Sequence, residues 1–155
     1  MMVRILALGN KMPAWVNEGF QEYAKRLTHA FTFELCEIPL EKRSKNIDTS
    51  RLIEREGKKL LAAIKPAHKI IALHVKGRSF STEELATQFK QWAMHGTSID
   101  LLIGGPDGLS TECLQKADMT WSLSPLTLPH PLVRILLAEQ LYRVMSILQN
   151  HPYHR

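Results

Sequence analysis

The chain has 155 residues, of which 45% are hydrophobic and 23% charged, with a formal net charge of +5 at pH 7. A chain of this size is expected to form one domain over residues 1–155 that buries a substantial core. It has no apolar run long enough to span a membrane and no export signal at its start, so we expect a cytoplasmic protein with no membrane partner.

Apolar, β-prone segments alternate with segments of helical period along the whole chain. Strands are predicted at residues 2–9, 31–38, 69–75, 99–105 and 119–124. Helices are predicted at residues 13–27, 49–64, 81–96, 111–117 and 131–149. The third helix should begin at the capping box formed by Ser81 and Glu84. Such an alternation of strands and helices predicts an α/β fold with a mostly parallel sheet.

Positive charge concentrates in residues 41–59, where seven Lys or Arg residues accompany four acidic ones. This segment is either a solvated loop and helix face or a surface for RNA, and the sequence leaves both interpretations open. The only two cysteines, Cys36 and Cys113, lack the spacing of metal ligands. We therefore expect two free thiols and no metal site.

Ligands of parallel α/β sheets bind at the carboxyl ends of the strands. Three segments follow predicted strands there: HVKGRSF (74–80), GGPDGLS (104–110) and SPLTLPHP (124–131). Gly104 and Gly105 let a ligand approach the backbone, although a plain tight turn is the alternative. In the third segment prolines stiffen the backbone and leucines supply apolar surface, which is typical of either a small-molecule pocket or a rigid connector.

The last predicted helix is apolar around most of its circumference. A helix of this kind is either central in its domain or packed against a partner. We favour a homodimer, in which a two-fold axis pairs like surfaces.

Three long motifs carry a resemblance to a known family: LLIGGPDGLS (101–110), WSLSPLTLPHPLVRILLAEQLYR (121–143) and NHPYHR (150–155). They resemble the RlmH family of ribosomal RNA large-subunit methyltransferases, in the SPOUT class. The resemblance covers essentially the whole chain, including LGNKMPAWV (8–16) and EIPLEKRSKN (37–46). It implies a SPOUT-type α/β domain whose C-terminal segment forms a trefoil knot, and a homodimer.

By resemblance, the activity is transfer of a methyl group from S-adenosylmethionine to N3 of a pseudouridine in 23S rRNA, in assembled ribosomes. The residues implied to hold the cofactor are Leu73, Gly104, Gly105, Leu123, Ser124, Pro125, Leu126, Thr127 and Leu128. Pro125 departs from the family pattern because a proline has no backbone N–H to offer a ligand.

Methylation of a uracil-type N3 requires a base that removes its proton or a cation that stabilises the ring anion. The candidate catalytic residues are His130, Tyr153, His154 and Arg155. The candidate RNA contacts are Lys42, Arg43, Lys45, Arg134 and Arg143. Our hypothesis is that residues 150–155 close over the target nucleotide beside the cofactor, in their own subunit or in the partner's. The alternatives are another SPOUT enzyme that acts on tRNA or on a different rRNA base, and a non-catalytic ribosome-binding factor without a cofactor.

Overall fold

The computed structural model describes residues 1–27 and 31–155. Within these residues one sheet has the strand order β2-β1-β4-β3-β5. The strands are β1 (Met2–Leu8), β2 (Thr32–Ile38), β3 (Lys69–Ser79), β4 (Ile99–Ile103) and β5 (Met119–Ser122). Every pair of neighbouring strands is parallel. The predicted α/β fold with a parallel sheet is confirmed.

The helices lie close to their predicted positions. They are α1 (Ala14–Ala24), α2 (Thr49–Ala63), α3 (Thr82–Met94), α4 (Thr111–Lys116) and α5 (His130–Leu148). The short 3-10 helix η2 (Pro152–His154), which the sequence did not predict, follows α5. The predicted capping box starts α3: the Ser81 hydroxyl accepts from the N–H of Glu84 at 3.1 Å, and the Glu84 carboxylate accepts from the N–H of Ser81 at 2.8 Å. Pro131 lies in the first turn of α5, where a missing N–H costs no hydrogen bond.

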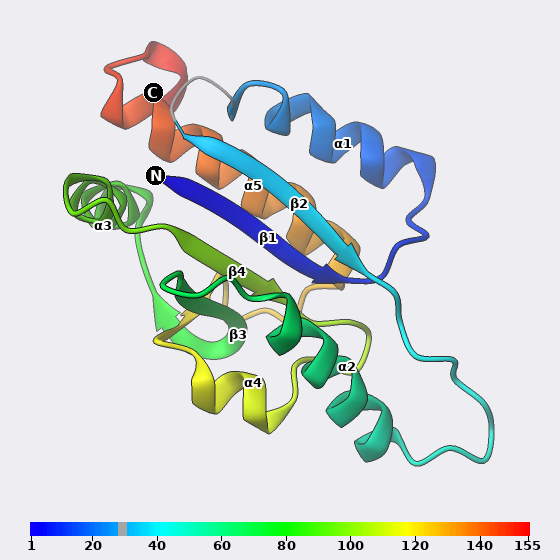
Figure 1. Cartoon of the computed structure of the whole chain (residues 1–155). Helices are drawn as coiled ribbons and strands as arrows, with labels where there is room; N and C mark the ends of the chain where they lie inside the picture. Colours follow the sequence, from blue (N-terminus) through cyan, green and yellow to red (C-terminus); the bar gives the residue numbers. More distant parts are fainter. Residues whose placement is uncertain (28–30) are drawn as a thin grey trace.

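Helices cover both faces of the sheet (Figure 1). Helices α1, α3 and α5 contribute to a core on one face, which includes Phe20, Phe89, Leu137 and Leu141. Helices α2 and α4 contribute to a second core on the other face, which includes Leu60 and Cys113. Successive side chains of a strand point to opposite faces, so Ile5 joins the first core and Leu6 the second. The neighbouring strands β1 and β4 are buried along nearly their whole length because helices cover both faces of the sheet there.

Strand β3 is longer than predicted. The sequence ended it at Val75, whereas it continues to Ser79. Its pairing with β4 stops at Ala72, and its register with β5 shifts between Leu73 and Arg78. Gly77 permits this bend, because a Cβ atom there would lie 2.8 Å from backbone atoms of the neighbouring strand. The trefoil knot that the family resemblance implies at this edge of the sheet stays a prediction.

Both cysteines are free, Cys113 buried and Cys36 half-buried. In residues 1–27 and 31–155 no three His, Cys, Asp or Glu side chains gather in a way that could hold a metal ion. Across the same residues no helix has the length and apolar character needed to cross a membrane.

Candidate functional site

A cavity of about 850 Å³ opens at the carboxyl ends of β3, β4 and β5. Its walls come from residues 73–75 of β3, from the segment 103–109 after β4, and from the segment 121–133 that leads from β5 into α5. These are the strand ends at which the sequence placed a ligand site. The volume lies within the range of about 300 to 1,000 Å³ that small-molecule sites occupy.

Most of the residues predicted to bind a cofactor line this cavity. They are Leu73, Gly104, Gly105, Leu123, Ser124, Leu126, Thr127 and Leu128. Pro125 is exposed and is not among the lining residues, so a cofactor contact at Pro125 has no support from its position. Sequence reasoning missed Trp121 and Val133, because buried apolar residues of a strand and a helix look the same with or without a cavity beside them.

The glycine loop after β4 folds back tightly on itself. A Cβ atom on Gly104 would lie 2.6 Å from the carbonyl carbon of Gly108 and 2.8 Å from the nitrogen of Leu109. The N–H of Gly108 donates to the carbonyl of Gly105 at 3.0 Å, and Gly108 has a φ of +82°, which favours glycine. The segment is therefore a tight turn that forms one wall of the cavity, and its contact with a ligand stays a prediction.

The proline-rich loop is held by hydrogen bonds of two serines. The hydroxyl of Ser122 donates to the carbonyl of Ser124 at 3.0 Å, and the N–H of Leu126 donates to the hydroxyl of Ser124 at 3.0 Å. Leu126 lines the cavity and is nevertheless 70% exposed. An apolar side chain at the open side of a cavity offers a surface that a flat ligand ring can cover.

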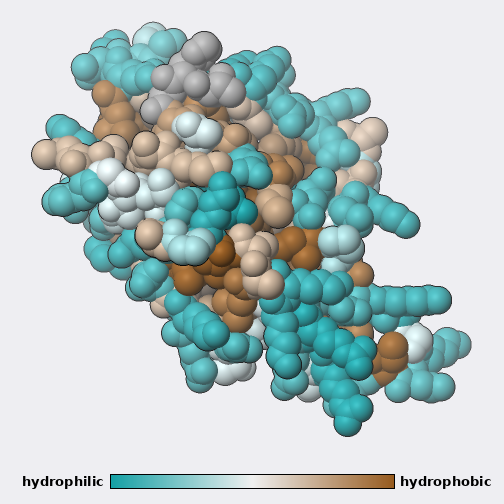
Figure 2. Space-filling view, in the orientation of Figure 1, coloured by the Kyte–Doolittle hydropathy of each residue, from teal (hydrophilic) through white to brown (hydrophobic). Residues whose placement is uncertain are grey.

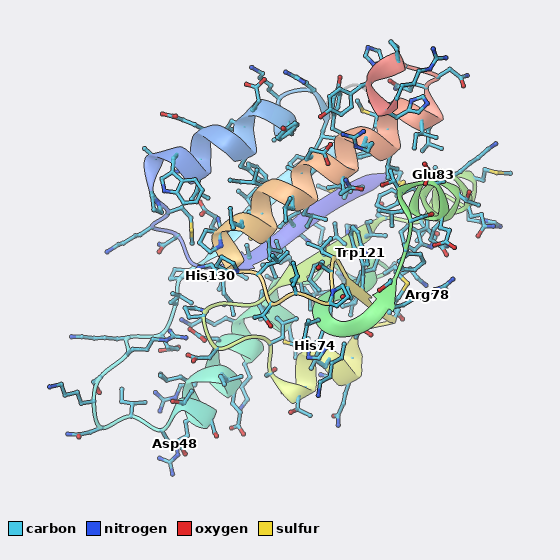
Figure 3. All side chains as sticks on the ribbon, turned by 180° about the vertical axis from the view of Figure 1, so that it is seen from behind. Asp48, His74, Arg78, Glu83, Trp121 and His130 are labelled. Atoms are coloured by element: carbon cyan, nitrogen blue, oxygen red, sulfur yellow. The ribbon has the colours of Figure 1, made fainter. Side chains whose placement is uncertain are left out.

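A smaller cavity of about 350 Å³ adjoins the first. It is lined by Gly9, Asn10, Lys11, Met12, Pro13, Leu40, His130 and Pro131. His130 and Pro131 line both cavities, so the two cavities share this part of their boundary. Figure 3 shows His130 at the start of α5. Burial lowers the pKa of His130 below its ordinary value, and the positive charges of Arg134 and Arg43 lower it further. A lowered pKa favours the neutral imidazole, which can accept a proton.

Arg134, one helical turn after His130, is buried at 1% exposure. Its Nη1 lies 2.6 Å from a carboxylate oxygen of Glu37, and its Nη2 donates to the carbonyl of Gly9 at 2.6 Å. This guanidinium joins α5 to the ends of β1 and β2. It also holds Gly9, which lines the smaller cavity. An RNA contact at Arg134, expected from the sequence, conflicts with this burial.

The other predicted RNA contacts differ in how free their side chains are. Lys42 and Lys45 are exposed, and Figure 2 shows hydrophilic residues over α2 and the segment before it. Arg43 is bound by Glu56 and by Asp107. Two lysines of the basic segment therefore offer positive charge to a partner, whereas Arg43 is engaged within the protein.

The C-terminal tail packs against the second half of α5. The hydroxyl of Tyr153 donates to a carboxylate oxygen of Glu139 at 3.2 Å, and its ring lies 4.4 Å from that of Tyr142. Arg143 forms an ion pair with Glu139 at 2.7 Å and lies over the Tyr153 ring. Burial raises the pKa of Tyr153, and the charge of Glu139 raises it further. These contacts hold a segment that would fray if it had none.

The tail and the cavities lie at opposite ends of α5 (Figure 3). The helix has 19 residues, which corresponds to about 28 Å at 1.5 Å per residue. His130 is its first residue, whereas His154 and Arg155 follow its last. One subunit therefore does not bring its own tail over its own cavity, and the four predicted catalytic residues are divided between the two ends.

A parallel α/β sheet with a cavity walled by three strand-end loops is the architecture in which small molecules bind at the carboxyl edge of the sheet. The family can be named: the family model described as "Predicted SPOUT methyltransferase" matches residues 1–154, and the chain belongs to this family. The membership that the sequence motifs predicted is thereby confirmed.

Relatives of known name cover the whole chain. The chain is 55% identical over 155 residues to "Ribosomal RNA large subunit methyltransferase H" of Marinomonas sp. (strain MWYL1), with 100% of both chains aligned. It is 50% identical over 155 residues to the protein of the same name from Pseudomonas putida (strain W619), again with 100% of both chains aligned.

Solved structures share the fold at low sequence identity. A probable methyltransferase from Bordetella pertussis Tohama I superposes with a TM-score of 0.57 at 15% identity, over 92% of this chain and 93% of that one. A probable methylase family protein from Haemophilus influenzae Rd KW20 superposes with a TM-score of 0.55 at 14% identity, over 99% of this chain and 70% of that one. At these identities the likeness concerns the fold alone.

Proposed function

We propose that this protein, acting as one domain, transfers a methyl group from S-adenosylmethionine to N3 of a pseudouridine in the 23S rRNA of the ribosome. The proposal is supported by its membership of a methyltransferase family and by relatives named as ribosomal RNA large subunit methyltransferases. The observation that carries it is the pair of adjoining cavities, because a transfer reaction needs one site for the donor and one for the acceptor.

The larger cavity fits S-adenosylmethionine in size and lining. Leu73, Leu123 and Leu126 offer apolar surfaces for the adenine ring, and the backbone of Gly104 and Gly105 offers polar groups to its edges and to the sugar. When bound, this cofactor supplies a methyl group on a positively charged sulfur. The rest of the cofactor leaves as a neutral thioether, which is an excellent leaving group. The loops have only to orient that methyl group toward the smaller cavity.

The smaller cavity is the proposed place of the target base. His130 lies in the wall between the two cavities, where its neutral imidazole can take the proton from N3 of the ring. Asn10 and Lys11 carry N–H donors that suit the two carbonyl oxygens of a uracil-type base. This arrangement assigns proton transfer to His130 and recognition of the ring to the loop after β1.

The tail completes the site from a second copy of the chain. In this proposal Tyr153 stacks on the extruded base and Arg155 holds a phosphate or the ring anion, while His154 is the alternative proton acceptor. Because the tail packs on the second half of α5, against Glu139 and Tyr142, and His130 lies at the first end of that helix, the partner subunit has to supply these residues. Lys42 and Lys45 face the rRNA that surrounds the target base. The enzyme works in the cytoplasm.

An exposed apolar surface on α1 and α5 supports the homodimer. These two helices pack together (Figure 1), and Ile135 lies directly against Gly19, where a Cβ atom would be 2.9 Å away. Trp15 is 54% exposed, Leu132 38% and Leu136 41%. Neighbouring helices that expose large apolar side chains suit a two-fold contact with an identical surface.

Two measurements test the proposal. Calorimetric titration with S-adenosylmethionine should release heat in a one-to-one ratio with the chain. Mass mapping of nucleosides in rRNA from cells that lack the protein should show the loss of one methylated pseudouridine, restored by the wild-type gene. No binding heat would favour a ribosome-binding factor, and a methyl group missing from tRNA or from another rRNA base would favour a different SPOUT acceptor.

A further inference from the structure

A buried carboxylate lies beneath the basic segment, at Glu56 on α2. Its side chain is 1% exposed. It accepts hydrogen bonds from the backbone N–H of Glu41 at 3.0 Å and from Nη1 and Nη2 of Arg43 at 2.9 and 3.1 Å. A carboxylate removed from water is costly unless it is paired and hydrogen-bonded, and these donors satisfy it. Glu56 therefore holds Arg43 in one orientation.

Arg43 also reaches Asp107, in the tight turn after β4. Its Nε and Nη2 lie 3.2 and 3.0 Å from one carboxylate oxygen of Asp107, and its Nη1 donates to the carbonyl of Glu41 at 3.1 Å. With the two bonds to Glu56, this makes five hydrogen bonds for the five N–H donors of a guanidinium. No donor remains for a phosphate, so the predicted RNA contact at Arg43 does not fit its surroundings.

The turn that Asp107 belongs to is a wall of the larger cavity. Gly104, Gly105 and Gly108 line that cavity on either side of Asp107 in the sequence. The segment before α2 meets the same turn a second time, because a Cβ atom on Gly105 would lie 2.9 Å from the side chain of Leu40. Residues 40–43 therefore hold the turn by one apolar contact and one ion pair.

We propose that Arg43 is a positioning residue for the cofactor: held by Glu56, it fixes the 105–108 turn through Asp107 in the shape that receives the donor molecule. The inference rests on the proposed function, in which the larger cavity holds S-adenosylmethionine. It assigns to the basic segment a structural part in cofactor binding, separate from the RNA contacts of its exposed lysines.

The Asp107→Asn variant is the sharpest test, since it keeps the Arg43–Glu56 pair and the shape of the side chain. We expect its affinity for S-adenosylmethionine, measured by calorimetry, to fall by roughly two- to thirty-fold. Without any ligand, hydrogen exchange at the N–H groups of Gly108 and Leu109 should become faster than in the wild type. The Arg55→Gln variant, an exposed change beside Glu56, is the matched control and should leave both measurements unchanged.

A double-mutant comparison then locates the effect. If Arg43 acts on the cofactor site through its ion pair with Asp107, the double variant Arg43→Gln/Asp107→Asn should weaken cofactor binding no more than Arg43→Gln alone. Should Arg43→Gln fail to fold because Glu56 loses its partner, Asp107→Asn decides by itself. Wild-type affinity and exchange in Asp107→Asn would overturn the inference and leave the proposed function intact. Absence of cofactor binding by the wild type would instead defeat the proposed function, and exchange at Gly108 would still decide whether Arg43 orders the turn.

Discussion

The two ends of α5 differ in what their polar groups are doing. At the first end, His130 and the loops around Gly104 and Ser124 border open cavities. At the last end, Tyr153, Glu139 and Arg143 satisfy one another in a packed cluster. One chain thus has open cavities at one end of α5 and a packed tail at the other. If the tail acts in the reaction as proposed, cofactor binding and methyl transfer should be separable by mutation.

Removal of residues 151–155 should have the largest effect. We expect methyl transfer to ribosomes to be lost, because the stacking and charged side chains of the tail are gone, while calorimetry shows cofactor affinity within about threefold of the wild type. Normal turnover by the truncated protein would contradict the role of the tail.

Mixed dimers decide which subunit's tail acts. A tail-deleted chain mixed with a chain whose cavity is blocked by Gly104→Val should regain part of the activity, since a heterodimer combines one intact cavity with the tail of the other chain. Each variant alone should be inactive. No recovery on mixing, with heterodimers detected by native mass spectrometry, would mean that the tail serves its own subunit.

A matched pair of glycine variants sharpens the description of the cavity end. Gly104→Ala places a methyl group against backbone atoms, whereas Gly105→Ala meets the end of the flexible Leu40 side chain. Overpacking against a fixed neighbour costs about 1 to 3 kcal/mol, so Gly104→Ala should weaken cofactor binding by about tenfold or more. Gly105→Ala should cause a clearly smaller loss. Calorimetric titrations measure both affinities. An equal loss of cofactor affinity in the two variants would contradict the role given to the close contact between Gly104 and the backbone.

Two arginines allow the ends of α5 to be compared in stability. Arg134→Met should lower the free energy of unfolding by about 3 kcal/mol, the lower end of the range for breaking a buried ion pair, because Glu37 is partly exposed. Arg143→Met removes a more exposed pair and should cost less than about 1 kcal/mol. Urea unfolding measures both. Similar values would mean that the tail end is packed as firmly as the cavity end.

The smallest effect should come from the pH dependence of His130. Its folded-state pKa is lowered by burial and by Arg134 and Arg43, so the unfolded chain takes up a proton at higher pH than the folded one. The resulting stability is present above the ordinary histidine pKa and is lost as pH falls through the folded pKa. NMR titration should give a pKa below the ordinary value, and His130→Asn should flatten the decline in stability below neutral pH.

The sequence predicted elements whose signals are local. Apolar periodicity located the strands and helices, and the strand-end rule located the cavity loops. The extension of β3 was not predicted because its sequence KGRS has no apolar periodicity. The path of this extension depends on the contact of Gly77 with a strand more than forty residues later. Arg134 escaped because an arginine on an apolar helix looks the same whether it is buried or exposed. Only the folded positions of Glu37 and Gly9 give it a partner.

The packing of the first helix on the last affects how the chain is made. Val16, Phe20 and Ala24 form the buried face of α1, and this face rests on a helix that begins only at residue 130. During translation the face stays uncovered until α5, more than one hundred residues later in the chain, has been made. A newborn chain with such a surface is prone to aggregation and is a natural client of chaperones that shield apolar segments. The packing of α1 on α5 is therefore a late step in folding during synthesis.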